Sequence, residues 1–295
     1  AQVTKTGLLF VLDRDTGEPF LPIEERPVPP GIVEGEVLSP TQPFPVATPP
    51  IVPNTVDPAD AFGITWFDKR ECRKMLESSR AEGLYTPPSE EGTILLPFTG
   101  GGANWGGAAF DPARNLLVVN MSNLAHHIQL FRADDLETMR EVYHDQEVSP
   151  QEGAPFGMKR VTALSSLGLP CTPPPWGIIA GIDLASGNIV WRRTIGTTED
   201  LSLGPGAKLG TPTRGGPMIT AGGLVFIGAT MDHYLRAFDV STGDELWQGR
   251  LPAPGNATPM TYRWQGRQYV VIYAGGIARD GTALSDQLIA FALPE

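Results

Sequence analysis

A twelve-residue pattern occurs twice in this chain, and it constrains the fold more than any other feature of the sequence. Segments 180–191 and 236–247 each place an Asp, a Gly four residues later and a Trp four residues after that. Alternating apolar residues on both sides of the turn are typical of antiparallel strands. The Asp carboxylate accepts turn N–H groups, the Gly takes a positive φ, and the Trp offers a flat apolar surface. The pattern therefore predicts β-hairpins that pack on one another.

Two degraded copies extend this repeat toward the start of the chain. Residues 10–21 keep the Asp and Gly but have Leu21 in the Trp position, and residues 110–119 keep only the turn and the following strand. The chain has 34 Gly and 29 Pro, against roughly 35 of both together for an average chain of this length, which favours turns over helices. Repeating units with a recurring Trp are typical of β-propeller blades. We predict an all-β fold of about four blades, which is few for a closed ring.

Three stretches interrupt the pattern. Residues 19–58 contain twelve prolines, which predicts an extended, polyproline-like arm without regular structure. Residues 68–82 are rich in helix-forming residues, with Asp68 as the expected cap and Gly83 as the expected stop, so they predict the one substantial helix. Residues 145–175 carry Gly and Pro and are predicted to form an irregular loop.

The charge balance limits the possible partners. The 22 Lys and Arg are outnumbered by 33 Asp and Glu, which gives a net charge of -11. An acidic chain repels phosphate backbones, so nucleic acid is not an expected partner. No apolar stretch approaches the roughly 18 residues that a membrane-spanning helix needs. We therefore expect any export signal or anchor to lie outside this chain.

Only two cysteines occur, Cys72 and Cys171. One disulfide is the simplest interpretation and would suit an oxidising compartment such as the periplasm, while two unpaired buried thiols remain the alternative. Neither cysteine has a His or Cys at ligand spacing, so no residue of the chain is predicted to bind a metal. The four histidines are predicted to be structural or exposed, and Trp176 is predicted to serve packing.

Six short strings are more specific than the repeat. Two of them are residues 5–13, which begin Lys-Thr-Gly, and residues 101–106, which read Gly-Gly-Ala-Asn-Trp-Gly. The other four are residues 39–44, 85–90, 169–171 and 232–238. Together they resemble the membrane-bound PQQ-dependent (quinoprotein) glucose, quinate and polyol dehydrogenase family, and the resemblance extends over the whole chain.

The resemblance implies a fold and a function. Family members form an eight-bladed propeller behind an N-terminal membrane part, and residues 1–295 look like the C-terminal half of that propeller. The implied activity is PQQ-dependent oxidation of a polyol, sugar or cyclic hydroxy acid in the periplasm, with electrons passed to ubiquinone. The N-terminal half is then the expected partner, and it is expected to supply the catalytic base and the ligands of a calcium or magnesium ion.

The same resemblance implies site residues. Lys5 is implied to contact the ortho-quinone oxygens of PQQ, where an ammonium stabilises developing negative charge. Asn104 is implied to lie against the cofactor, and Trp105 is a candidate for stacking on its flat ring. Asp232 is the candidate catalytic residue of this chain, able to orient Lys5 or a substrate hydroxyl, although an Asp in a hairpin turn usually shapes the turn.

Two departures from the family pattern concern the substrate. Ile277 stands where glucose-oxidising relatives have a His, which makes glucose a doubtful substrate. Arg214 stands where relatives have an apolar or aromatic residue; we interpret it as a solvated side chain, with attraction of an acidic group as the alternative. The competing function is a non-catalytic propeller scaffold of the periplasm, which would lack the Lys-Thr-Gly context.

Overall fold

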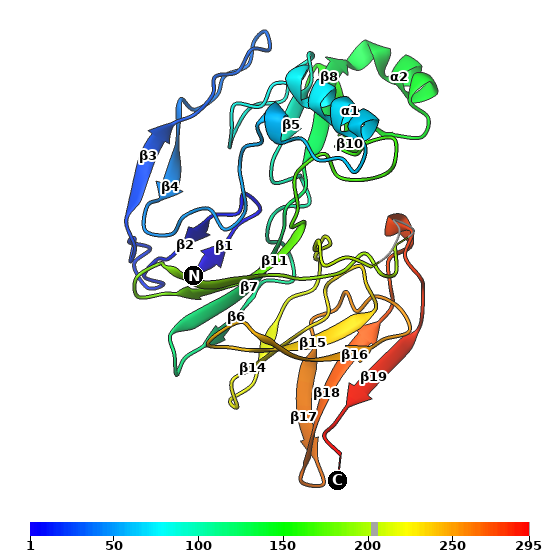
Figure 1. Ribbon diagram of the computed structural model, residues 1–295. Helices are drawn as coiled ribbons and strands as arrows, with labels where there is room; N and C mark the ends of the chain where they lie inside the picture. The colour runs from blue at the N-terminus through cyan, green and yellow to red at the C-terminus, as the bar shows by residue number, and fades with distance from the viewer. Residues whose placement is uncertain (202–205, 295) are drawn as a thin grey trace.

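Strands dominate the structure, a computed structural model that describes residues 1–201 and 206–294. Four antiparallel sheets lie side by side in the lower part of Figure 1 and form the blade region. The first sheet pairs β1 (Gln2–Val3) with β2 (Leu9–Phe10). The second has the order β12 (Ile189–Thr194), β11 (Gly177–Asp183), β7 (Leu116–Ser122) and β6 (Ala108–Asp111).

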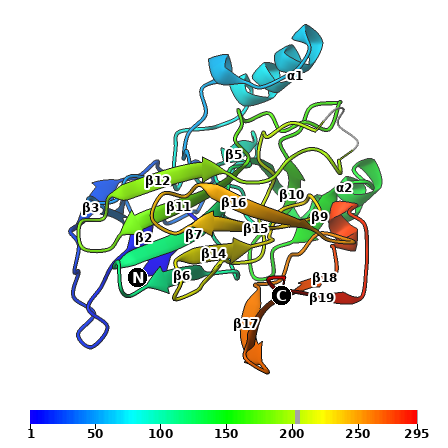
Figure 2. The same ribbon diagram turned by 60° about the horizontal axis from the view of Figure 1, so that its bottom comes forward.

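The last two sheets follow the chain without crossovers. The third contains β13 (Met218–Ile219), β14 (Leu224–Ile227), β15 (Tyr234–Asp239) and β16 (Glu245–Arg250) in that order. The fourth contains β17 (Met260–Trp264), β18 (Arg267–Ala274) and β19 (Gln287–Phe291). This series confirms the predicted all-β blades, and Figures 1 and 2 show that it does not close into a ring.

Apolar layers between the sheets hold the series together. Every residue of β7 is buried, because alternate side chains point to opposite faces of the strand and both faces are covered. Met121 packs with Leu9 of the first sheet, whereas Val118 packs with Val225 of the third. Leu235 of the third sheet in turn packs with Ile272 of the fourth.

The predicted turn chemistry of the repeat is present. The Gly187 N–H donates to the Asp183 carbonyl at 2.8 Å, and the Ser186 N–H donates to the Asp183 carboxylate at 2.8 Å. Gly187 has a φ of +78°, which favours Gly because it has no Cβ. The copy at 236–247 makes the same bonds through Asp239, whose carboxylate accepts the Thr242 N–H at 3.0 Å.

Trp191 shows why the repeat spacing matters. Its ring is 5% exposed, and its Nε1 donates to the Val240 carbonyl of the next sheet at 2.9 Å. A Cβ added to Gly243, in the next repeat's turn, would lie 2.4 Å from this ring. The Trp of one repeat therefore packs on the Gly of the next repeat, as the sequence pattern predicts.

This packing gives a first testable prediction. Gly243→Ala is expected to lower the free energy of unfolding by about 3 kcal/mol, because Ala is strained at positive φ and its methyl group displaces the Trp191 ring. Gly17→Ala is the matched control: Gly17 has a φ of +77° and nothing within 4 Å of the added Cβ, so only about 1 kcal/mol is expected. Urea unfolding measures both. Equal losses would contradict the packing role of Gly243.

A second lobe lies above the blades in Figure 1. Its sheet has the order β5 (Thr93–Leu95), β8 (His126–Arg132), β10 (Phe156–Thr162) and β9 (Glu147–Pro150). Beside it lie the helices α1 (Trp66–Glu77) and α2 (Leu136–Val142). Residues 123–125 join β7 directly to β8, so one strand path runs from a blade into this lobe.

The two stretches that were predicted to be irregular contain regular structure. Residues 19–58 are not an irregular arm, because β3 (Ile23–Pro27) pairs with β4 (Thr41–Pro45) and a 3-10 turn, η1, forms at Pro58–Asp60. A two-stranded hairpin tolerates Pro where the missing N–H has no ladder partner. Residues 145–175 are likewise not wholly irregular, since they contain β9 and β10.

The predicted helix is real but displaced. Thr65, not Asp68, is the N-cap of α1: the Thr65 hydroxyl accepts the Asp68 N–H at 3.1 Å, and Asp68 accepts the Ile64 N–H at 2.9 Å. The helix ends at Glu77 with Ser78 as its C-cap, so Gly83 is not its stop. The seven residues of α2 form a second, shorter helix that the sequence did not indicate. Within the described residues, no helix has the length and apolar character to cross a bilayer.

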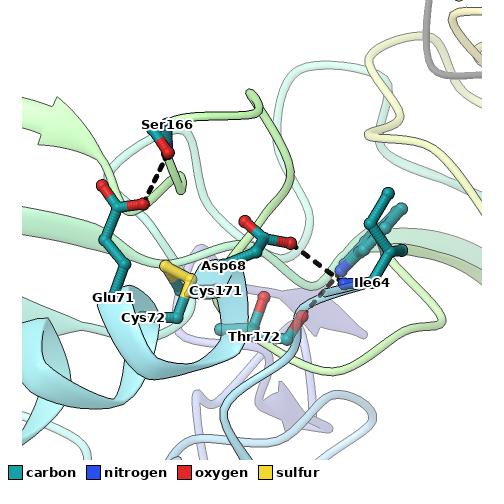
Figure 3. Close-up of a disulfide and its surroundings, with 8 residues drawn as sticks. Ile64, Asp68, Glu71, Cys72, Ser166, Cys171 and Thr172 are labelled. Carbon is teal, nitrogen blue, oxygen red and sulfur yellow. Dashed lines mark hydrogen bonds between the residues drawn. A yellow bond between two sulfur atoms is a disulfide. The ribbon is translucent and has the colours of Figure 1, made fainter. Parts of the chain in front are cut away.

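The two cysteines form a disulfide (Figure 3). Cys72 of α1 is bonded to Cys171, 99 residues later, and both are fully buried. Glu71 reinforces the link, because its carboxylate accepts both the N–H and the hydroxyl of Ser166, at 3.0 and 2.7 Å. The cysteines are therefore paired and are not free thiols. Their disulfide joins α1 to the loop before β11.

Candidate functional site

A cleft with a volume of about 690 Å³ lies among the described residues. Phe98, Leu124 and Trp176 give it an apolar wall, and Asn104, Arg214 and Asp280 supply polar groups. The Trp176 ring is buried, packs edge-on against Phe62 and donates from Nε1 to the Thr172 carbonyl at 2.8 Å. Its packing role is therefore as predicted. An apolar cleft with a few polar groups is the usual form of a small-molecule site.

Lys5 and Asn104 converge on one loop at the edge of this cleft. The Lys5 Nζ donates to the Thr99 carbonyl at 3.2 Å, and the Asn104 Nδ2 donates to the neighbouring Gly100 carbonyl at 2.6 Å. Gly102 N–H completes the link by donating to the Lys5 carbonyl at 2.8 Å. Lys5 does not itself line the cleft, but Gly100 and Asn104 do. The fold thus joins the Lys-Thr-Gly turn to the Asn-Trp loop.

Gly101 makes this approach possible. It has a φ of +93°, and a Cβ at this position would lie 2.6 Å from the Lys5 Cγ. The Lys5 side chain therefore lies directly on a backbone without a side chain. Any larger residue at Gly101 would push the lysine away from the loop.

Trp105 lies at the cleft and is 98% exposed. The residue after it, Gly106, packs backbone to backbone on Gly216, since a Cβ on Gly106 would lie 2.6 Å from the Gly216 nitrogen. The buried Asn120 secures the same contact by donating to the Gly215 carbonyl at 2.9 Å. Asn120 of β7 thus supports the loop that carries Trp105.

Arg214 differs from its interpretation as a solvated side chain. Its guanidinium makes a bidentate ion pair with Asp280, in which Nε and a terminal nitrogen each lie 2.6 Å from a carboxylate oxygen. Asp280 belongs to the 3-10 turn η3 (Ala278–Asp280), which Ile277 caps. Paired charges of this kind are oriented by both partners and carry no net charge. The sequence did not indicate Asp280.

Asp232 lies away from the cleft surface, although its neighbour Met231 lines the cleft. The Asp232 side chain is 0% exposed and forms a buried ion pair with Arg236 at 2.5 Å. Thr230 donates to one carboxylate oxygen at 2.5 Å, and the Thr197 N–H donates to the other at 2.6 Å. Because both oxygens already accept hydrogen bonds, this geometry favours a positioning role for Asp232 over the expected catalytic one.

His126 lies behind the cleft, where its ring meets Phe98 edge-on at 5.0 Å. Burial, followed by the nearby Arg160, lowers the pKa of His126 to about 4 against a smaller opposing effect of Glu147. Burial and Lys159 also lower the pKa of His127. Both histidines are therefore neutral at physiological pH.

These shifts predict how stability depends on pH. The unfolded chain binds a proton on His126 below about pH 6.5, whereas the folded chain binds it only below about pH 4. The free energy of unfolding is therefore expected to fall by about 2–3 kcal/mol between pH 6.5 and 4. Urea unfolding across this window measures the loss, and His126→Gln should flatten it. A variant with the same pH slope as the wild type would contradict the assignment.

Comparison with known proteins decides the family. The family model described as "PQQ: Glucose/ethanol/alcohol dehydrogenase, beta-propeller domain" matches residues 1–270. The chain belongs to this family. Quinoprotein glucose dehydrogenase A of Acinetobacter calcoaceticus is 43% identical over 305 residues, which cover 99% of this chain and 38% of that protein. Quinate/shikimate dehydrogenase (quinone) of Acinetobacter baylyi is 40% identical over 303 residues, which cover 98% of this chain and 37% of that protein.

A solved structure supports the fold. A europium-containing methanol dehydrogenase aligns with a TM-score of 0.55 and 22% identity, over 93% of this chain and 36% of that chain. This likeness bears on the fold alone. The chain thus spans less than two fifths of the length of the glucose and quinate/shikimate dehydrogenases named above.

The residues at the cleft fit a group such as PQQ, a flat tricyclic ortho-quinone with carboxylates. Trp105 offers an exposed flat ring, Asn104 an amide, and Lys5 an ammonium beside the same loop. A volume of about 690 Å³ is within the range of cofactor clefts. Among residues 1–201 and 206–294, no group of three or more His, Cys, Asp and Glu side chains is arranged to hold a metal ion.

Proposed function

We propose that this chain forms one side of the cofactor site of a PQQ-dependent alcohol dehydrogenase that oxidises a polyol or sugar. The observation that supports it best is the convergence of Lys5 and Asn104 on the carbonyls of Thr99 and Gly100, beside an exposed Trp105. These residues lie in the two strings that the family resemblance connects with the cofactor.

Each residue has a role in this proposal. Lys5 holds a positive charge at the loop edge, where it would stabilise negative charge on a quinone oxygen. Asn104 would hold the cofactor through hydrogen bonds of its amide, and Trp105 would offer its ring for packing. When bound, PQQ supplies the two-electron oxidising capacity that no side chain provides. Asp232 orients the Thr197–Thr230 region next to the cleft through its contacts with both threonines.

The charge of the cleft favours an uncharged substrate. Arg214 and Asp280 are the charged residues of the described cleft lining, and they neutralise each other. A hydroxy acid such as quinate would have to compete with Asp280 for the guanidinium. We therefore favour a neutral polyol or sugar over a carboxylic acid, and Ile277 disfavours glucose among the sugars.

The rest of the site is proposed to come from the N-terminal half of the propeller. That half would supply the catalytic base, the calcium or magnesium ligands and the membrane association, and electrons would pass to ubiquinone. The buried Cys72–Cys171 disulfide supports a periplasmic location, because disulfides persist in oxidising compartments. A non-catalytic scaffold is the alternative, and nothing in the cleft favours it.

Oxidation by the full-length polypeptide tests the proposal. The protein is loaded with PQQ and either Ca²⁺ or Mg²⁺, and dye reduction is recorded with glycerol, sorbitol, glucose and quinate. PQQ-dependent oxidation is expected, fastest with an uncharged polyol. Absence of PQQ-dependent oxidation with every substrate would contradict the enzyme proposal, whereas a preference for quinate would contradict only the substrate class.

A further inference from the structure

Thr99 connects Lys5 to the second lobe. Its carbonyl accepts the Lys5 Nζ at 3.2 Å, while its hydroxyl lies 3.0 Å from an Arg160 terminal nitrogen and 2.9 Å from the His126 Nδ1. Three residues from different parts of the chain thus meet on one threonine. None of the cofactor-side strings in the sequence includes His126 or Arg160.

The Thr99 hydroxyl can satisfy both of its neighbours. Arg160 is only a donor, so the Thr99 oxygen accepts from it. Burial and Arg160 lower the pKa of His126, so its ring is neutral. A ring with its proton on Nε2 accepts the Thr99 hydroxyl proton at Nδ1, whereas a ring with its proton on Nδ1 donates to the second lone pair of the Thr99 oxygen. Either tautomer makes the Thr99–His126 hydrogen bond.

The outer end of the network is fixed by the sheet. Arg160 of β10 is in register with Glu147 of β9, and the Arg160 Nε donates to the Glu147 carboxylate at 3.1 Å. His126 of β8 pairs with Thr162 of β10 and packs edge-on against Phe98. The charged and titratable groups that face His126 from these strands are Arg160 and Glu147.

The loop that begins at Thr99 has few side chains of its own to hold it in place. Thr99 is followed by Gly100, Gly101 and Gly102, which have no side chains to hold the loop in place. Backbone of this kind is conformationally free unless neighbouring contacts fix it. The Thr99 hydroxyl and the neighbouring Phe98 ring both tie the beginning of this loop to the sheet.

We propose that Thr99 and His126 are positioning residues for Lys5, which fix the carbonyl that holds the lysine ammonium at this loop. The importance of this role for catalysis rests on the proposed function, but the orientation of Lys5 does not. Loss of the Thr99–His126 contact is expected to release Lys5 from the loop without removing it.

Labelling of lysines tests the orientation in the 295-residue chain without a cofactor. Thr99→Val and His126→Phe remove the two halves of the contact, and Phe keeps a ring against Phe98. Acetylation of Lys5, followed by mass spectrometry, should become about threefold faster in both variants and stay unchanged in Thr99→Ser, which keeps the hydroxyl. Lys208, which pairs with Glu245 at 2.8 Å, is the internal control and should not change.

A double-mutant cycle tests the effect on the reaction in the full-length, PQQ-loaded protein. Thr99→Val and His126→Phe should each lower kcat about tenfold alone, but should have no further effect on a Lys5→Ala background. Unchanged Lys5 labelling in both folded variants, or equal losses of kcat with and without Lys5, would overturn the proposal. Should the wild type show no PQQ-dependent turnover, the proposed function fails, while the labelling result still decides the role of Thr99 and His126.

Discussion

Lys5→Ala is expected to lower the kcat of the PQQ-loaded, full-length protein about 10²- to 10³-fold. Removal of one fixed group that stabilises developing charge has an effect of this size in other enzymes. The structure holds the Lys5 ammonium at the Thr99 carbonyl, next to the loop of Asn104. The ammonium is therefore held beside this loop before any cofactor binds.

Steady-state kinetics with an artificial dye as acceptor measure this effect. Lys208→Ala is the matched control, because it removes an exposed lysine paired with Glu245 and should change kcat less than twofold. Lys5→Arg should recover only part of the activity, since a planar guanidinium does not reproduce the position of an ammonium. A Lys5→Ala variant within threefold of the wild type would refute the role of Lys5.

The second large effect concerns the disulfide. Cys72→Ala/Cys171→Ala is expected to lower the free energy of unfolding by about 3–5 kcal/mol. The bond closes a loop with a sequence separation of 99, so its loss frees a long segment in the unfolded chain. It also detaches α1 from the loop that contributes Gly168 and Pro170 to the cleft, so weaker cofactor binding should accompany the loss of stability.

Urea unfolding of the variant and of the wild type, with and without dithiothreitol, measures this contribution. The reduced wild type should unfold at the same urea concentration as the double variant, and the reductant should leave the variant unchanged. A midpoint shift that corresponds to less than about 1 kcal/mol would show that burial around Cys72, rather than the bond, stabilises this region.

Local features of the fold were predictable from sequence because they depend on neighbouring residues. The turns at Asp183 and Asp239 follow from carboxylate and Gly chemistry within five residues, and the packing of Trp191 follows from the repeat. Proline content was a poorer guide. Pro43 and Pro45 lie in β4 opposite Glu25 and Ile23, where a two-stranded hairpin leaves one edge of each strand free of ladder bonds.

The site was predictable only in part, because its contacts are non-local. Lys5 and Asn104 were identified from a family resemblance. Nothing in their spacing indicates that their side chains donate to the neighbouring carbonyls of Thr99 and Gly100. Asp280 pairs with Arg214 across 66 residues, and no local pattern marks either as a partner. Asp232 was identified from its string, but its carboxylate accepts a hydrogen bond from Thr197, 35 residues away, which no local pattern indicates.

Equilibrium binding of PQQ to the full-length protein tests the central claim most directly, namely that this chain forms one side of the cofactor site. The cofactor is titrated in the presence of Ca²⁺ or Mg²⁺ and followed by its absorbance. We expect saturable binding of one PQQ per protein, weakened at least about tenfold by Lys5→Ala/Asn104→Ala and unchanged by Lys208→Ala. Absence of binding by the wild type, or equal affinity in the double variant, would contradict the account.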